Sequence, residues 1–136
     1  RTAEIFAAES LIIPDISVSK MDNFKSISVS AAEWIDIKEC KEDNLPKWLN
    51  ERKSEGYTIV GLEQTSSSIC LSTLSFPEKT VLLLGKEKEG IPVELLQLVD
   101  ECVEIPQLGI IRSLNVHVSG ALAIWEYSKQ MMMRKK

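Results

Sequence analysis

The chain has 136 residues, 44% hydrophobic and 26% charged, which predicts a single globular domain with a core of its own. No apolar run approaches the roughly 20 residues that cross a bilayer, so we expect no membrane partner. The formal net charge of −4 argues against nucleic acid on composition alone, because phosphate neutralisation usually leaves a basic footprint. A basic face would have to be local, with Arg112, Lys86, Lys88 and residues 134–136 as its candidates.

The three cysteines are scattered along the chain, and none belongs to a C-x-x-C pair. This pattern argues against a disulfide framework and against a zinc site, so no metal is expected. It favours a reducing compartment, the cytoplasm or the nucleus. The chain starts at Arg1 inside a helical-looking stretch, residues 1–9, and we therefore expect it to be a piece of a longer polypeptide.

Short apolar segments recur at nearly even intervals and predict strands. They start about 23 residues apart, which suits compact strand-plus-crossover units, and they are Ser10–Ile13, Trp34–Ile37, Tyr57–Leu62, Thr80–Leu84 and Cys102–Ile105. Several are continuously apolar rather than alternating. Strands buried on both faces of a parallel sheet have this character.

The connecting segments predict helices. Residues 44–55 open with a capping-type Asn44 and an early Pro46, and Gly56 follows them. A short helix is expected over Pro92–Val99 and a long one over Ser113–Met131, while residues 64–78 read as loop with one helical turn. The expected fold class is α/β, with a mostly parallel sheet and helices on both faces. Ligands of such folds bind beyond the carboxyl ends of the strands.

One unusual strand end is Leu82–Pro92, LLLGKEKEGIP, where Gly85 and Gly90 flank a charged strand-to-helix turn. Glycines let backbone groups approach a ligand closely. The spacing resembles a P-loop, but Ile91 and Pro92 replace the Lys-Ser/Thr pair, which disfavours a phosphate cradle. The alternative is an ordinary loop with a solvated tip.

The second unusual strand end is Ile105–Gly120, IPQLGIIRSLNVHVSG. Gly109 permits a tight turn, and Arg112, Ser113 and Asn115 gather at the start of the long helix, with Ser113 the expected N-cap. Polar groups at a helix start beside a strand end suit a ligand site. Helix capping alone would explain Ser113 but not the cluster.

These segments carry a family resemblance. LLLGKEKEGIP is similar to the second motif of SpoU-class RNA 2'-O-ribose methyltransferases of the SPOUT superfamily, with its Gly-x-Glu-x-x-Gly core. IPQLGIIRSLNVHVSGALAIWEY resembles their third motif, Ile-Pro-x-x-Gly followed by Ser-Leu-Asn-Val. RTAEIF resembles the end of the first motif, whose last arginine would be Arg1. In particular, the chain resembles the C-terminal domain of large eukaryotic tRNA (guanosine(18)-2'-O)-methyltransferases.

The resemblance implies a catalytic domain over residues 1–136 that lacks its first strand and most of motif one. It implies a C-terminal deep trefoil knot, a homodimer, and transfer from S-adenosyl-L-methionine, with S-adenosyl-L-homocysteine as product, to a tRNA ribose in the D-loop. The pocket that binds the methyl donor would be lined by Leu84, Gly85, Gly90, Ile105, Gly109 and Leu114.

The resemblance also implies catalytic roles. Arg1 would contact the 2'-hydroxyl and a phosphate, Ser113 and Asn115 would orient the ribose or support the arginine, and Glu87 would brace the site. As members of the local basic face, Arg112 and Lys86 are the residues we expect to contact RNA. Lys86 departs from the family, which commonly has Asn or a small residue there, and it would either alter donor binding or add an RNA contact. Because Arg1 lies at a cut edge, we predict that the isolated chain lacks RNA methylation activity.

Other interpretations follow from the residues alone. Glu87 would be a solvated loop carboxylate, and His117, two residues past Asn115, points to another side of the helix and suits a structural role. Trp125, Tyr127 and the Met131–Met133 run suit helix packing and a dimer surface. The rival functions are a catalytically impaired donor-binding or RNA–protein interaction module and, further off, an unrelated nucleotide-binding α/β domain.

Overall fold

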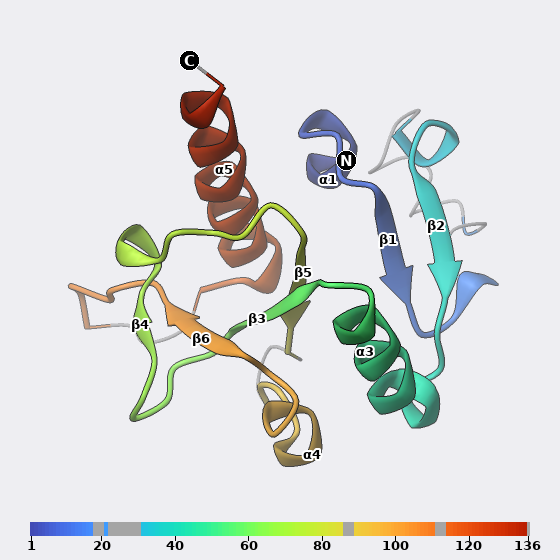
Figure 1. Cartoon of the computed structure of the whole chain (residues 1–136), viewed down its shortest axis with the longest axis horizontal. Helices are drawn as coiled ribbons and strands as arrows, with labels where there is room; N and C mark the ends of the chain where they lie inside the picture. The colour runs from blue at the N-terminus through green and yellow to red at the C-terminus, as the bar shows by residue number, and fades with distance from the viewer. Residues whose placement is uncertain (18–20, 22–30, 86–88, 111–113, 136) are drawn as a thin grey trace. The chain divides into compact units, whose positions relative to one another are not determined.

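The computed structural model describes residues 1–17, 21, 31–85, 89–110 and 114–135, and it divides into two compact units, Arg1–Trp48 and Leu49–Lys136 (Figure 1). Each unit contains a parallel sheet. The described strands therefore pair in two sheets, where the strand spacing suggested a single one. Every described strand pair is parallel, which confirms an α/β fold built on parallel pairing.

The first unit pairs strand β1 (Ser10–Ile13) with strand β2 (Asp36–Glu39). Short helix α1 (Thr2–Ile5) precedes β1, and the 3-10 turns η2 (Ala31–Glu33) and η3 (Glu42–Asn44) flank β2. The strand predicted over Trp34–Ile37 is displaced by two residues. Trp34 donates its backbone N–H to Ala31 of η2 and is 76% exposed, so the turn holds it outside the strand.

The sheet of the second unit has the strand order β4-β6-β3-β5. Its strands are β3 (Thr58–Leu62), β4 (Ile69–Cys70), β5 (Thr80–Leu84) and β6 (Glu101–Glu104). Strand β3 pairs with β5 on one side and β6 on the other, and its central residues 59–61 are buried. This position explains why its sequence is continuously apolar.

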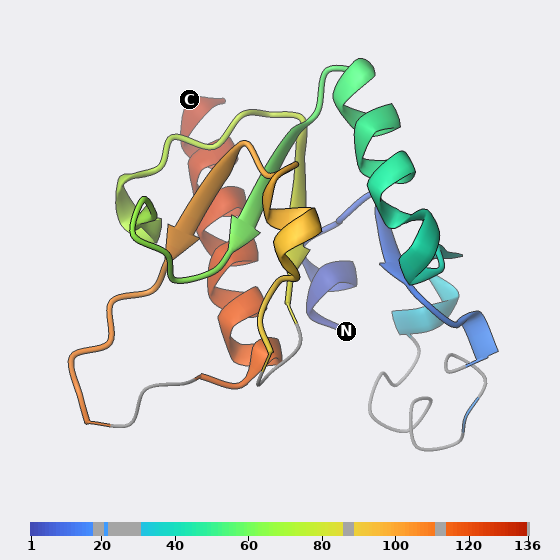
Figure 2. The ribbon, with the colours of Figure 1, turned by 90° about the horizontal axis from the view of Figure 1, so that it is seen from below.

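Helices lie on both faces of this sheet, with α5 (Val116–Arg134) against one and α4 (Val93–Leu96) on the other (Figure 2). On the α4 face, Gly61 leaves room for Ile91 and Val99, whose side chains would lie about 3.1 Å from a Cβ at that position. The α5 face carries the main core of the unit, made of Val60, Leu71, Leu74, Phe76, Val103 and Ala123.

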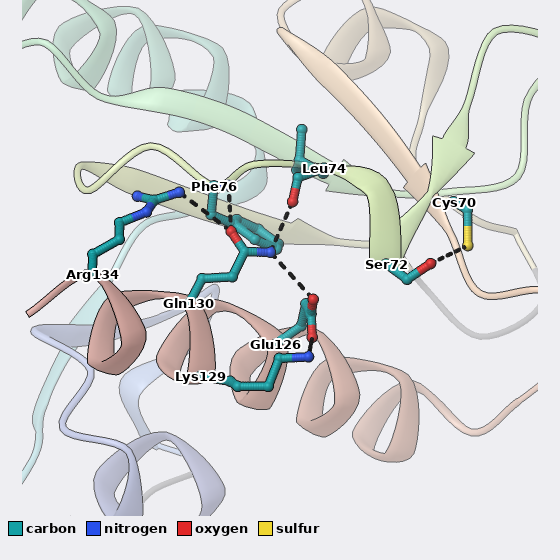
Figure 3. Close-up of polar contacts among 8 residues, drawn as sticks. All are labelled: Cys70, Ser72, Leu74, Phe76, Glu126, Lys129, Gln130 and Arg134. Carbon is teal, nitrogen blue, oxygen red and sulfur yellow. Dashed lines mark hydrogen bonds and ion pairs between the residues drawn. The ribbon is translucent and has the colours of Figure 1, made fainter. Parts of the chain in front are cut away.

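The C-terminal half of α5 is fixed to the segment before β5 by Gln130 (Figure 3). Its Oε1 accepts the backbone N–H of Phe76, and its Nε2 donates to the carbonyl of Leu74, each at 2.8 Å. One turn later, Arg134 donates to the Ser75 hydroxyl at 2.9 Å. A single side chain thus pairs the backbone of an irregular segment, as a strand neighbour would.

Several helices and strands begin or end at other residues than the sequence predicted. Helix α3 (Leu45–Ser54) and β5 match the prediction closely, and α4 is shorter than the helix predicted over Pro92–Val99. The loop predicted over residues 64–78 contains the two-residue strand β4 besides the expected turn, η4 (Leu71–Thr73). The expectation that Ser113 caps the long helix is wrong, because α5 begins at Val116.

Candidate methyl-donor site

A cavity of about 180 Å³ lies where the carboxyl ends of β3, β5 and β6 meet the start of α5. This is the edge of a parallel sheet at which α/β folds bind ligands. Its walls are formed by Leu62, Glu63, Gln64, Leu84, Gly85, Gly90, Val103, Glu104, Ile105, Gln107, Leu114, Val116 and Ser119.

Most of the residues predicted to line a methyl donor border this one cavity. They come from three chain segments and are Leu84, Gly85, Gly90, Ile105 and Leu114. Gly109 does not line it. Gly109 is exposed, and a Cβ built on it would meet no atom of the described residues within 4 Å.

The two glycines of the turn after β5 bring their backbones together. A Cβ on Gly85 would overlap the backbone of Gly90 and Ile91, so only glycine allows this approach. Gly90 has a φ of +70°, in the left-handed region that favours glycine. We call this contact between Gly85, Gly90 and Ile91 the glycine neck. It forms part of the cavity wall through backbone groups rather than side chains.

Glu63, at the end of β3, is a site residue that the sequence analysis missed. Its backbone N–H donates to Val103 of β6 at 3.0 Å, and its Oε2 accepts the Ile91 N–H of the glycine neck at 2.7 Å. A carboxylate directly after a buried strand was the only available signal. It pointed to the correct end of the sheet but not to Ile91.

The charges on the cavity wall have one sign. Among the lining residues, all of which lie in the described part of the chain, only Glu63 and Glu104 carry ionisable side chains. Two carboxylates at a partly enclosed site produce a negative potential.

Asn115 caps α5. Its Oδ1 accepts the backbone N–H groups of His117 at 2.8 Å and Val118 at 3.4 Å. The cap satisfies donors that the first turn of a helix leaves unpaired.

The remaining predicted site residues are placed as follows. Arg1 belongs to the first unit, where its side chain is exposed and its carbonyl accepts the Ile5 N–H at the start of α1. Four predicted residues lie outside the described residues, namely Lys86, Glu87, Arg112 and Ser113.

The side chains of His117, Tyr127 and Trp125, all on α5, differ in exposure and packing. The side chain of His117 is exposed. Tyr127 packs edge-on against Phe76, with ring centroids 5.8 Å apart, and donates its hydroxyl to the Glu78 carbonyl at 2.6 Å. Burial raises the pKa of Tyr127 above its ordinary value of 10.0. The packing role predicted for Tyr127 is therefore confirmed, whereas Trp125 is exposed.

The described part of the chain contains no group of three or more His, Cys, Asp and Glu side chains arranged to hold a metal ion. None of its helices combines the length and apolar character that a bilayer crossing requires.

Comparison with known proteins identifies relatives along the whole chain. The model of the SpoU rRNA Methylase family matches residues 1–125. The tRNA (guanosine(18)-2'-O)-methyltransferase TARBP1 of Mus musculus is 50% identical over 133 residues, which are 98% of this chain and 8% of that protein.

Two solved structures share the fold at low sequence identity. The TrmH/SpoU tRNA modifying enzyme of A. aeolicus has a TM-score of 0.85 and 23% identity, over 98% of this chain and 67% of that one. The SpoU methyltransferase AviRb of Streptomyces viridochromogenes, in complex with the cofactor AdoMet, has a TM-score of 0.81 and 21% identity, over 97% and 53%. With the family match across residues 1–125, these findings lead to one conclusion: the chain belongs to the SpoU rRNA methylase family.

Proposed function

We propose that the protein transfers a methyl group from S-adenosyl-L-methionine to the 2'-hydroxyl of a ribose in RNA, and that guanosine 18 in the D-loop of tRNA is its substrate. The main observation behind this proposal is the cavity at the carboxyl ends of β3, β5 and β6, because five of the predicted donor-lining residues border it. The substrate is inferred from the mouse relative, whose name specifies this tRNA guanosine. The chain spans only 8% of the length of that relative.

The residues of the cavity fit the donor. When bound, S-adenosyl-L-methionine supplies an electrophilic methyl group on a positively charged sulfonium. The carboxylate of Glu104, on the wall of the cavity, offers a negative charge that such a cation favours. The glycine neck, where a Cβ on Gly85 would overlap the backbone of Gly90 and Ile91, presents backbone groups rather than side chains to the ligand. The AdoMet complex of AviRb, which has the same fold, supports this assignment.

The chain's own residues would then act on the acceptor. A ribose hydroxyl is a poor acid, so the negative charge that develops on its oxygen needs stabilisation. We assign that role to Arg1. Asn115, whose Oδ1 caps α5, would orient the ribose or support Arg1. Ser113 would assist it, Glu87 would brace the site, and Lys86 and Arg112 would contact RNA.

The proposed enzyme is a knotted homodimer. The knot is inferred from the family; in the described residues α5 lies beside β5, where a Cβ on Gly120 would be 3.1 Å from the Leu84 side chain. Support for the dimer comes from exposed apolar side chains along α5, namely Val118, Leu122, Trp125, Met132 and Met133. We place the enzyme in the cytoplasm or the nucleus, in keeping with its free cysteines.

The proposal is tested on the full-length protein with tRNA and the methyl donor. We expect 2'-O-methylation of guanosine 18 by the wild type and a loss of about 10²-fold or more in Arg1→Ala, the scale on which removing one charge-stabilising donor acts. Lys47→Ala, which removes an exposed cation from α3, is the matched control. Wild type without methylation would overturn the proposed function, and an Arg1→Ala rate equal to wild type would overturn the role of Arg1.

A further inference from the structure

We propose that Glu63 is a positioning residue for the donor site, whose carboxylate holds the glycine neck at the carboxyl end of β5 in the shape that binds S-adenosyl-L-methionine. This inference rests on the proposed function. Glu63 would act through the backbone it fixes, and its hydrogen bond to Ile91 is the contact that carries the role.

The backbone of Glu63 has little freedom to move. It directly follows β3, the strand that pairs on both sides, and the pairing with β5 runs to Leu62 opposite Leu84. On the other side, the Glu63 N–H donates to the Val103 carbonyl of β6 at 3.0 Å. The side chain therefore projects from a fixed point of the sheet.

The carboxylate joins this fixed point to the glycine neck. Oε2 accepts the Ile91 N–H at 2.7 Å, across 28 positions of sequence, in a partly buried environment. The same carboxylate lies directly against Gly90, where a Cβ would overlap it. Glycine at position 90 therefore serves twice: it adopts the positive φ, and it leaves the space that the Glu63 carboxylate occupies.

A neck held in this way is preorganised. Gly85, Gly90 and Glu63 all line the cavity, so a movement of the neck changes the wall of the donor site. A ligand bound largely by backbone groups depends on how accurately those groups are placed, and a misplacement of about 1 Å can cost about a hundredfold in rate. Without the hydrogen bond from Ile91 to Glu63, the donor would have to order the glycine neck as it binds. This ordering costs free energy and would lower the affinity for the donor.

Three variants of Glu63 distinguish the effect of side-chain length from the effect of side-chain charge. Glu63→Gln keeps the length of the side chain and an oxygen that accepts from Ile91, but removes the charge. Glu63→Asp keeps the charge but is one methylene shorter, so its oxygens cannot reach Ile91 without distortion. Glu63→Leu removes both. Glu94→Leu, at an exposed carboxylate on α4 outside the cavity, is the matched control.

The measurements use the full-length protein. Calorimetry gives the Kd for S-adenosyl-L-homocysteine, and kinetics give separate KM values for the donor and for tRNA. We expect Glu63→Leu and Glu63→Asp to raise the Kd and the donor KM by about tenfold, as the loss of a partly buried hydrogen bond to a backbone donor predicts. The KM for tRNA should stay within about twofold of wild type in both variants. In Glu63→Gln, the Kd and both KM values should stay within about threefold of wild type.

The outcomes are distinguishable. Wild type that does not bind S-adenosyl-L-homocysteine overturns the proposed function, and the role of Glu63 with it. If wild type binds and Glu63→Asp binds equally well, positioning by Glu63 is wrong while the function stands. A loss in Glu63→Gln as large as in Glu63→Asp would also refute it, because charge rather than reach would then be responsible. Glu63→Gln and Glu63→Asp keep the test open if Glu63→Leu does not fold.

Discussion

Replacing Gln130 by leucine tests how α5 is held against the sheet of the second unit. The substitution keeps the volume of the side chain but leaves the Phe76 N–H and the Leu74 carbonyl without the partners they have at 2.8 Å (Figure 3). A buried backbone group left unpaired costs about 1–3 kcal/mol. Both contacts are partly buried, so we take the lower part of that range and expect a total loss of about 2–3 kcal/mol.

The assay is urea and thermal unfolding followed by circular dichroism. For a chain of this size, the expected loss corresponds to a fall in Tm of about 6–10 °C. Lys129→Met, one residue away, removes only a Glu126 ion pair and should cost less than about 1 kcal/mol. Amide hydrogen exchange at Phe76 should accelerate in Gln130→Leu alone. A Gln130→Leu protein within about 0.5 kcal/mol of wild type, with Phe76 still protected, would refute the reasoning.

Three further predictions concern single positions. Gly85→Ala should lower the free energy of unfolding by about 1–3 kcal/mol through overpacking against the backbone of Gly90, whereas Gly109→Ala, at an exposed glycine, should be nearly neutral in the same denaturation experiment. Asn115→Asp should keep the α5 cap and the melting temperature but lower tRNA methylation, because it loses the amide donor; an Asp variant as active as wild type would exclude that donor. The hydrogen bond from Lys129 lowers the pKa of Glu126 below its ordinary value of 4.5, so its stabilisation is complete above about pH 4.5 and is lost as the pH falls through the lower native pKa. The difference in unfolding free energy between wild type and Lys129→Met should accordingly vanish in acid, and a difference independent of pH would contradict this origin.

The sequence predicted the strands of the second unit well where burial on both faces made them continuously apolar. Strand β5 matches its predicted bounds, and β3 differs by one residue. Strand β4 was missed because its two residues lie in a Ser/Thr-rich segment and pair only with β6. A strand this short leaves no periodicity to detect.

The start of α5 shows the limit of local capping rules. Ser113 and Asn115 are both good N-cap residues, and the sequence alone does not choose between them. The structure selects Asn115, whose Oδ1 reaches two backbone donors of the first turn. The choice depends on where the chain leaves β6 and meets the sheet again, which is a tertiary property.

By itself, the sequence determined the strand ends at which the site lies, because motif glycines and polar residues directly follow apolar runs, and it determined the family through those same motifs. Only the tertiary structure brought Leu84, Gly85, Gly90, Ile105 and Leu114 to one cavity and left Gly109 outside it. It alone assigned Glu63 to Ile91 and Gln130 to the backbone of residues 74 and 76. The physical reason is that hydrogen bonds across 28 or 54 positions follow from sheet order and helix packing, which no local pattern encodes.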